Sequence, residues 1–168
     1  GAFRKDEAIE KLKKLSEFSI HSVEQPIMPK QLQEMADICE LSPISIALDE
    51  ELIGIHSTFE RQRILDIISP HFLIIKPSLL GGFKDSDNWI ALAEERKINW
   101  WATSALESNL GLNAIAQWVS TKKNNLRQGL GTGMLFSNNI QSPLEILKDE
   151  IFLNANKNWD SNFFKKNI

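Results

Sequence analysis

Short apolar runs alternate with helical stretches along most of this chain, and this alternation constrains the fold more than any other feature. Apolar residues recur at helical spacing in residues 6–18, 30–40, 59–68, 84–98 and 110–121. Apolar runs typical of strands lie at residues 19–24, 44–49, 72–76 and 99–105. Because parallel strands are buried on both faces, they form nearly continuous apolar runs. The order strand, helix, strand, helix therefore predicts an α/β fold, with parallel strands joined by crossover helices rather than a sandwich or a bundle.

Composition excludes several classes of protein. Of the 168 residues, 42% are hydrophobic and 24% are charged, which is typical of a globular domain and not of a disordered chain. The net charge of −3 shows no basic surplus, so we expect no nucleic-acid partner and no membrane partner. The apolar runs are too short to span a bilayer, and no signal peptide opens the chain. One cysteine, Cys39, provides no disulfide framework. These features predict a soluble, cytoplasmic protein.

Each predicted strand ends in a polar or charged residue. Glu24, Asp49, Lys76 and then Thr103 with Ser104 follow one another about 25 to 28 residues apart, close to the length of one strand–helix unit. In a β/α barrel the carboxyl ends of the strands meet at one mouth, where active sites are built. Two carboxylates and a lysine at one mouth indicate a hard, oxygen-liganded cation such as Mg²⁺ beside a cationic group. The alternative is that these side chains are ordinary solvated loop residues.

Four short motifs, in order and at the spacing of the strand–helix unit, carry a family resemblance. They are VEQP at residues 23–26, ALDE at 47–50, IKPS at 75–78 and TSALESNLGL at 103–112. Together they resemble the C-terminal barrel motifs of the enolase superfamily, across roughly residues 1–135. Within the superfamily they are most similar to the o-succinylbenzoate synthases of menaquinone biosynthesis. The resemblance implies a lyase that carries out a syn dehydration of a small carboxylate substrate through an enediolate.

The resemblance also implies roles for individual residues. Glu24 and Asp49 would be the second and third carboxylates of the Mg²⁺ site, and Mg²⁺ would stabilise the enediolate. Lys76 would lie across the substrate from the general base and act as an electrostatic partner.

Four further residues would contact or closely approach the substrate. The resemblance places Thr103 and Ser104 against its succinyl end, and Gly129 and Gly131 where the backbone approaches the mouth.

The same resemblance predicts that part of the site lies outside this chain. The first metal carboxylate, the base lysine and the N-terminal capping domain would precede Gly1. We therefore expect residues 1–135 to form a partial β/α barrel that is inactive alone and needs the missing N-terminal half as a partner. Residues 136–168, with Trp159, Phe163 and Phe164, would be an extension that packs on the barrel or on the capping domain.

Other interpretations stay open. The same residues fit a racemase, epimerase or cycloisomerase of the superfamily, with Lys76 as a second acid/base, because a fold does not fix its substrate. A non-catalytic barrel fragment is a third possibility. His21, His56 and His71 lack metal-ligand spacing and are interpreted as structural. Gly81-Gly82 predicts a tight strand-to-helix turn, and Trp100-Trp101 predicts packing in the core.

Overall fold

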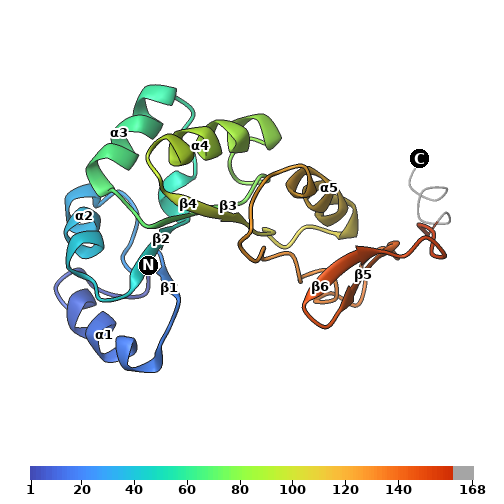
Figure 1. Cartoon of the computed structure of the whole chain (residues 1–168), viewed down its shortest axis with the longest axis horizontal. Helices are drawn as coiled ribbons and strands as arrows, with labels where there is room; N and C mark the ends of the chain where they lie inside the picture. The colour runs from blue at the N-terminus through green and yellow to red at the C-terminus, as the bar shows by residue number, and fades with distance from the viewer. Residues whose placement is uncertain (161–168) are drawn as a thin grey trace. The chain divides into compact units, whose positions relative to one another are not determined.

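The structure is a computed structural model that describes residues 1–160. It divides into two compact units, Gly1–Trp101 and the chain from Ala102 onward (Figure 1). Phe163 and Phe164, which the sequence places in a C-terminal extension, lie outside the described residues. The expected division of the chain at residue 135 stays a prediction.

A four-stranded sheet with order β1-β2-β3-β4 organises the first unit. The β1–β2 and β2–β3 pairs are parallel, which confirms the predicted α/β class. The strands are β1 (Ser22–Glu24), β2 (Ser45–Leu48), β3 (Phe72–Ile75) and β4 (Asn99–Ala102). The helices are α1 (Ala8–Leu15), α2 (Leu32–Leu41), α3 (Thr58–Ile68) and α4 (Phe83–Glu95), with short 3₁₀ turns at η1 (Ser16–Phe18) and η2 (Glu50–Leu52).

Helices α2, α3 and α4 lie on the same side of this sheet (Figure 1). Ile46 and Leu48 of β2 and Leu73 of β3 are fully buried, as is Trp89 of α4. Burial of such side chains contributes roughly 1.5–3 kcal/mol each before the cost of chain ordering. The apolar runs read from the sequence therefore form the core that fixes where each strand ends.

Several element boundaries differ from the sequence prediction. Helix α1 stops at Leu15, and β1 begins only at Ser22, because Ser19 has a left-handed backbone (φ 53°) that a strand cannot contain. Strand β4 ends at Ala102, not at residue 105. The expected turn at Gly81-Gly82 is confirmed, since both residues have φ of 92° and Gly82 caps α4.

Aromatic and histidine side chains of this unit pack as structural residues. The Phe72 ring lies 5.3 Å from Trp101 and 4.9 Å from His21, measured between centroids. Trp100 is buried, as expected. His71 accepts a 3.1 Å hydrogen bond through Nδ1 from the backbone N–H of Ile46.

The second unit contains α5 (Asn109–Ser120) and an antiparallel hairpin of β5 (Leu144–Leu147) and β6 (Glu150–Leu153). Its core groups Leu112, Ile115 and Leu130. Helix α5 agrees with the helix predicted at residues 110–121, whereas the hairpin lies in residues 136–168, where only a polar extension was expected. The strands of the hairpin, Leu-Glu-Ile-Leu and Glu-Ile-Phe-Leu, are mainly apolar and flank a charged turn in which Lys148 has a φ of 58°.

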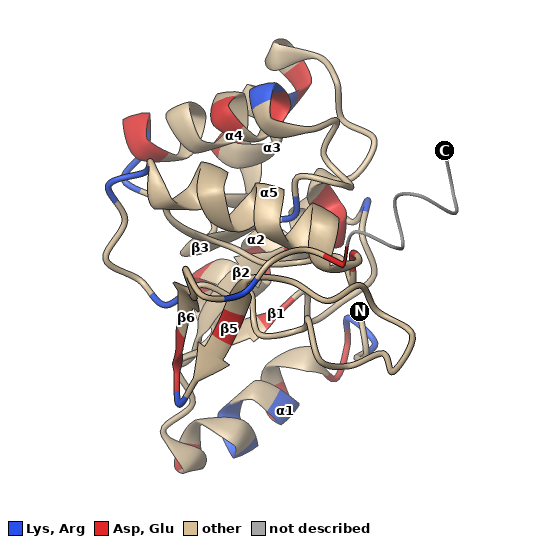
Figure 2. Cartoon of the chain, turned by 90° about the vertical axis from the view of Figure 1, so that its right-hand side faces the viewer, with Lys and Arg blue, Asp and Glu red and all other residues tan. Residues whose placement is uncertain are grey.

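The described surface carries mixed charge. On α1, lysines and acidic residues are interspersed (Figure 2), and Lys11 pairs with Glu7 and Lys14 with Glu10. Among residues 1–160, no helix combines the length and the apolar character that crossing a membrane requires.

Candidate active site

Three strand ends of the first unit carry the side chains that the sequence singled out. Glu24 is the last residue of β1, Asp49 directly follows β2 and Lys76 directly follows β3. Because these strands are adjacent and parallel, their carboxyl ends lie at one edge of the sheet. The structure therefore brings Glu24, Asp49 and Lys76 together.

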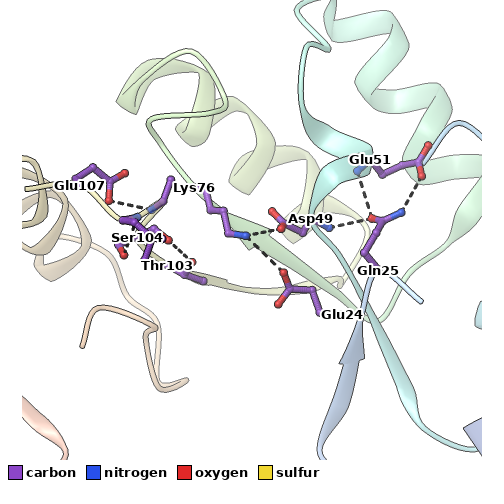
Figure 3. Close-up of polar contacts among 10 residues, drawn as sticks. Glu24, Gln25, Asp49, Glu51, Lys76, Thr103, Ser104 and Glu107 are labelled. Atoms are coloured by element: carbon purple, nitrogen blue, oxygen red, sulfur yellow. Dashed lines mark hydrogen bonds and ion pairs between the residues drawn. The ribbon is translucent and has the colours of Figure 1, made fainter. Parts of the chain in front are cut away.

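The ammonium of Lys76 joins the two carboxylates (Figure 3). Its Nζ donates a hydrogen bond to Oδ2 of Asp49 and lies 3.5 Å from Oε1 of Glu24. The Asp49 side chain is 5% exposed, the Lys76 side chain 19% and the Glu24 side chain 50%. The cluster is thus buried at Asp49 and open to solvent at Glu24, where another molecule can reach it.

Burial and charge act in opposite directions on the pKa values of this cluster. Burial and the proximity of Asp49 raise the pKa of Glu24, although Lys76 counteracts them. Burial lowers the pKa of Lys76, but its hydrogen bonds and charge interactions with Asp49 and Glu24 outweigh this effect and leave that pKa raised. In this arrangement Lys76 is a stably charged ammonium at neutral pH.

The donor set is compatible with a magnesium ion. Mg²⁺ is commonly held by one or two carboxylates and completes its octahedron with water and substrate oxygens. Glu24 and Asp49 supply two such carboxylates beside solvent. Within residues 1–160 no group of three or more His, Cys, Asp or Glu side chains could form a cage made of protein ligands alone. The residues present therefore fit a magnesium site that other ligands complete.

Sequence reasoning missed two buried polar residues behind this cluster. Gln25 is 1% exposed and Glu51 is 4% exposed, and they share a 3.2 Å hydrogen bond (Figure 3). Gln25 lies within the VEQP motif, and Glu51 follows the ALDE motif directly. The signal that could have found Gln25 is its place between a strand-end carboxylate and the apolar Pro26-Ile27 pair.

The second unit holds the residues expected to contact substrate. Thr103 forms a parallel bridge with Gly129, whose carbonyl accepts a 3.1 Å hydrogen bond from the N–H of Ser104. A Cβ added to Gly129 would meet the Thr103 Cβ at 2.9 Å, whereas one added to Gly131 would have open space around it. The Ser104 hydroxyl lies 2.5 Å from that of Thr132. This unit thus brings Thr103, Ser104 and Gly129 together, and their contact with substrate stays a prediction.

The Ser104 loop contains a further polar residue, Glu107, which belongs to the TSALESNLGL motif. The Glu107 carboxylate accepts a 2.8 Å hydrogen bond from the N–H of Ala105 (Figure 3). Leu106, which has a φ of 65°, donates its N–H to the Ser104 hydroxyl at 3.3 Å. The loop after β4 is therefore held by its own side chains.

Comparison with known proteins identifies the family. The model of the family described as "Enolase C-terminal domain-like" matches residues 1–160. The chain belongs to the enolase superfamily. It carries the C-terminal domain of that superfamily, as its strand-end motifs predict, and its parallel strands and helices form part of the barrel domain.

Individual relatives agree with this assignment. The chain is 54% identical over 146 residues to the o-succinylbenzoate synthase of Desulfotalea psychrophila, a match that covers 87% of the chain and 39% of that protein. The crystal structure of MenC from Desulfotalea psychrophila superposes with a TM-score of 0.87 at 52% identity, over 90% of this chain and 42% of that one. A dipeptide epimerase from Cytophaga hutchinsonii, solved with Mg and D-Ala-L-Val, has a TM-score of 0.78 at 23% identity over 89% of this chain and 40% of that one, which shows the shared fold. This enolase-superfamily chain thus spans about two fifths of the length of these relatives.

Proposed function

We propose that this domain supplies the C-terminal part of the active site of a Mg²⁺-dependent o-succinylbenzoate synthase. The observation that carries the proposal is the convergence of Glu24 and Asp49 on the Lys76 ammonium at the carboxyl ends of adjacent parallel strands. The 54% identity to an o-succinylbenzoate synthase supports this choice within the superfamily. The whole reaction requires residues beyond those of this chain.

The reaction in this proposal is the loss of water from a cyclic carboxylate. The C–H bond next to the carboxylate and a C–O bond on the neighbouring carbon break, a carbon–carbon double bond forms, and the proton and hydroxide leave as water. Glu24 and Asp49 would hold Mg²⁺, which as a Lewis acid supplies electrostatic stabilisation of the negative charge that develops on the substrate carboxylate. The proton is removed by a base that the proposal places outside this chain.

Lys76 has the role of an electrostatic partner in this proposal. Its ion pairs with Asp49 and Glu24 favour an ammonium in the metal-free site, whereas a general base must lose its proton before it acts. The fixed cation would bind the substrate more strongly in the transition state, where negative charge develops, than in the ground state, as differential binding requires. In a racemase or epimerase of the same superfamily Lys76 would instead exchange protons with the substrate.

The remaining parts of the proposal concern substrate and partners. Thr103, Ser104, Gly129 and Gly131 would contact or closely approach the succinyl part of the substrate, a small cytoplasmic carboxylate. The preceding part of the same protein would provide the base lysine, the first metal carboxylate and the capping domain. Residues 136–168 would pack on the barrel or on that capping domain.

Turnover by the full-length protein that contains this domain tests the proposal. We expect loss of the absorbance of the dehydration substrate in the presence of Mg²⁺ and no racemisation of N-acylated amino acids. Residues 1–168 alone should show no turnover above a buffer control, because catalytic groups act as a unit. Racemisation without dehydration would contradict the assignment to o-succinylbenzoate synthesis.

Two substitutions test the assigned roles. Asp49→Asn should abolish Mg²⁺ binding by calorimetry while the circular dichroism spectrum stays unchanged. Lys76→Ala in the full-length protein should lose nearly all dehydration but retain solvent exchange of the α-proton. Loss of that exchange, together with a structure that places the amine against the α-carbon, would make Lys76 the base.

A further inference from the structure

The side-chain amide of Gln25 uses its full hydrogen-bonding capacity. Its oxygen accepts hydrogen bonds of 3.2 Å from the N–H groups of Asp49 and Glu51. Its nitrogen donates at 3.2 Å to the carbonyl of Ile27 and at 3.2 Å to Oε2 of Glu51. An amide has two acceptor sites and two donor hydrogens, so every one is occupied. Among the other natural side chains, only asparagine has the same donors and acceptors, on a side chain that is one methylene shorter.

The carboxylate of Glu51 extends this network to a second loop. Its Oε1 accepts a 2.8 Å hydrogen bond from the N–H of Lys30, in the segment between β1 and α2. Lys30 has a positive φ of 70°, a backbone conformation that needs local support in a residue other than glycine. Glu51 therefore joins the loop after β1 to the loop after β2.

The network ends at the two carboxylates of the candidate site. Gln25 directly follows Glu24 in the chain, and its φ of 38° turns it out of the strand pattern. Its N–H still donates at 2.8 Å to the carbonyl of Ala47, which extends the pairing of β1 with β2. The bond from the Asp49 N–H to the Gln25 oxygen then fixes the backbone that carries the second carboxylate.

A pair of neighbouring carboxylates needs such support because like charges repel. Burial and Asp49 both disfavour the charged form of Glu24, and only Lys76 compensates. A loop that is free to move would let Glu24 and Asp49 separate into water. The buried Gln25–Glu51 network instead holds both backbones from behind, without occupying the open side of the site.

We propose that Gln25 and Glu51 are positioning residues that hold the backbones of Glu24 and Asp49 so that both carboxylates meet the Lys76 ammonium. This inference rests on the proposed function for its catalytic meaning, but the positioning itself can be measured without metal or substrate. Outer residues that orient metal ligands typically change metal affinity by about 10- to 100-fold when they are replaced.

The test compares Gln25→Met in the full chain with the matched control Gln33→Met. Gln33 lies on α2 and is exposed, and its side-chain amide donates a hydrogen bond to Asp37 one turn further along the helix. Two NMR measurements need no metal. The first is the hydrogen-exchange rate of the backbone amides of Asp49 and Glu51. The second is the signal of the Lys76 ammonium, whose protons are shielded from exchange with solvent by its two carboxylate partners. We expect Gln25→Met to accelerate both amides roughly 5- to 10-fold, as loss of one hydrogen bond allows, and to broaden the ammonium signal. Gln33→Met should change neither readout.

A reciprocal swap keeps the test decisive if Gln25→Met fails to fold. Gln25→Glu alone places a carboxylate against that of Glu51. The two charges repel, so the backbone amides of Asp49 and Glu51 should lose much of their protection against hydrogen exchange. Adding Glu51→Gln gives the introduced carboxylate an amide donor again, while the Lys30 N–H keeps an oxygen acceptor. We expect the double variant to recover part of the amide protection and of the ammonium signal. Recovery should be incomplete, because the Ile27 carbonyl still lacks the hydrogen bond that the Gln25 amide donates to it.

Calorimetry with MgCl₂ separates this inference from the proposed function. We expect Gln25→Met to weaken Mg²⁺ binding by about tenfold or more. Absence of Mg²⁺ binding in the unsubstituted chain, with both NMR readouts as expected, would contradict the metal site and leave the positioning inference supported. Unchanged amide exchange and an unchanged ammonium signal in Gln25→Met would overturn the positioning inference, as would a double variant no better than Gln25→Glu.

Discussion

The backbone N–H of Asp49 donates a 3.2 Å hydrogen bond to the side-chain oxygen of Gln25. This bond crosses from the end of β2 to the end of β1, so the conformation of one strand end depends on a side chain of its neighbour. The chemistry at the sheet edge therefore depends on a buried amide as well as on the charged groups that face solvent.

The pKa of Glu24 should respond in opposite directions to its two charged neighbours. Lys76→Met removes a cation and should raise the pKa of Glu24 further, whereas Asp49→Asn removes a carboxylate and should lower it. Carbon-13 titration of the Glu24 carboxyl measures both shifts. A folded-state pKa above the unfolded value means that the stabilising contribution of Glu24 is present at low pH and is lost as the pH rises through the folded pKa. No shift in either variant would show that burial alone sets the pKa of Glu24.

Arg61 should contribute strongly to the stability of the first unit. Its buried guanidinium donates at 3.1 Å to the carbonyl of Ile55 and at 2.8 Å to Asp85, and it lies 5.4 Å from the Trp89 ring centroid. Arg61→Met leaves these partners without their donor, so we expect a loss of more than about 2 kcal/mol in the free energy of unfolding.

Urea unfolding at 25 °C measures this loss, with Arg63→Met as the control. Arg63 lies two residues further along α3 and is exposed, so its replacement should change stability by less than about 0.5 kcal/mol. Equal losses in the two variants would argue against a special role for Arg61.

Cys39 should be chemically inert in the folded protein. Burial raises the pKa of its thiol to about 12, so almost none of the reactive thiolate is present at pH 8. Iodoacetamide at that pH should leave the native chain unmodified and should alkylate it rapidly in urea, as mass spectrometry can follow. Fast modification of the native protein would mean that α2 opens readily.

Gly129 and Gly131 should tolerate alanine differently. Gly129→Ala places a methyl group 2.9 Å from the Thr103 Cβ, and such overpacking typically costs about 1–3 kcal/mol. The methyl group of Gly131→Ala would lie in open space, and the backbone of Gly131 has no positive φ that would disfavour alanine. We therefore expect this substitution to leave the stability nearly unchanged. Thermal unfolding of the two variants compares them directly. A neutral Gly129→Ala would indicate that the strand pairing of Thr103 with Gly129 is loose.

The parts of the structure that follow from periodic patterns were predictable from the sequence. The run Phe72–Ile75 is wholly apolar, which identified β3 and placed Lys76 at its end. Gln25 was not predictable in the same way, because its positive φ takes it out of the alternation that reveals which face a strand residue occupies. Arg61 is hidden for another reason, since a cation on a helix normally indicates the solvent face. The β5–β6 hairpin was hard to predict, because the strands Leu144–Leu147 and Glu150–Leu153 do not alternate apolar and polar residues and lie between polar segments.

The ion pairs of Lys76 with Asp49 and Glu24 mean that this site contains its own counterion. In small zinc domains the metal is needed for folding, and chelators denature the protein. Here an ammonium built into the chain already neutralises much of the carboxylate charge. Under the proposed function, folding and Mg²⁺ binding are therefore separable events, because the domain reaches its folded form before the ion binds.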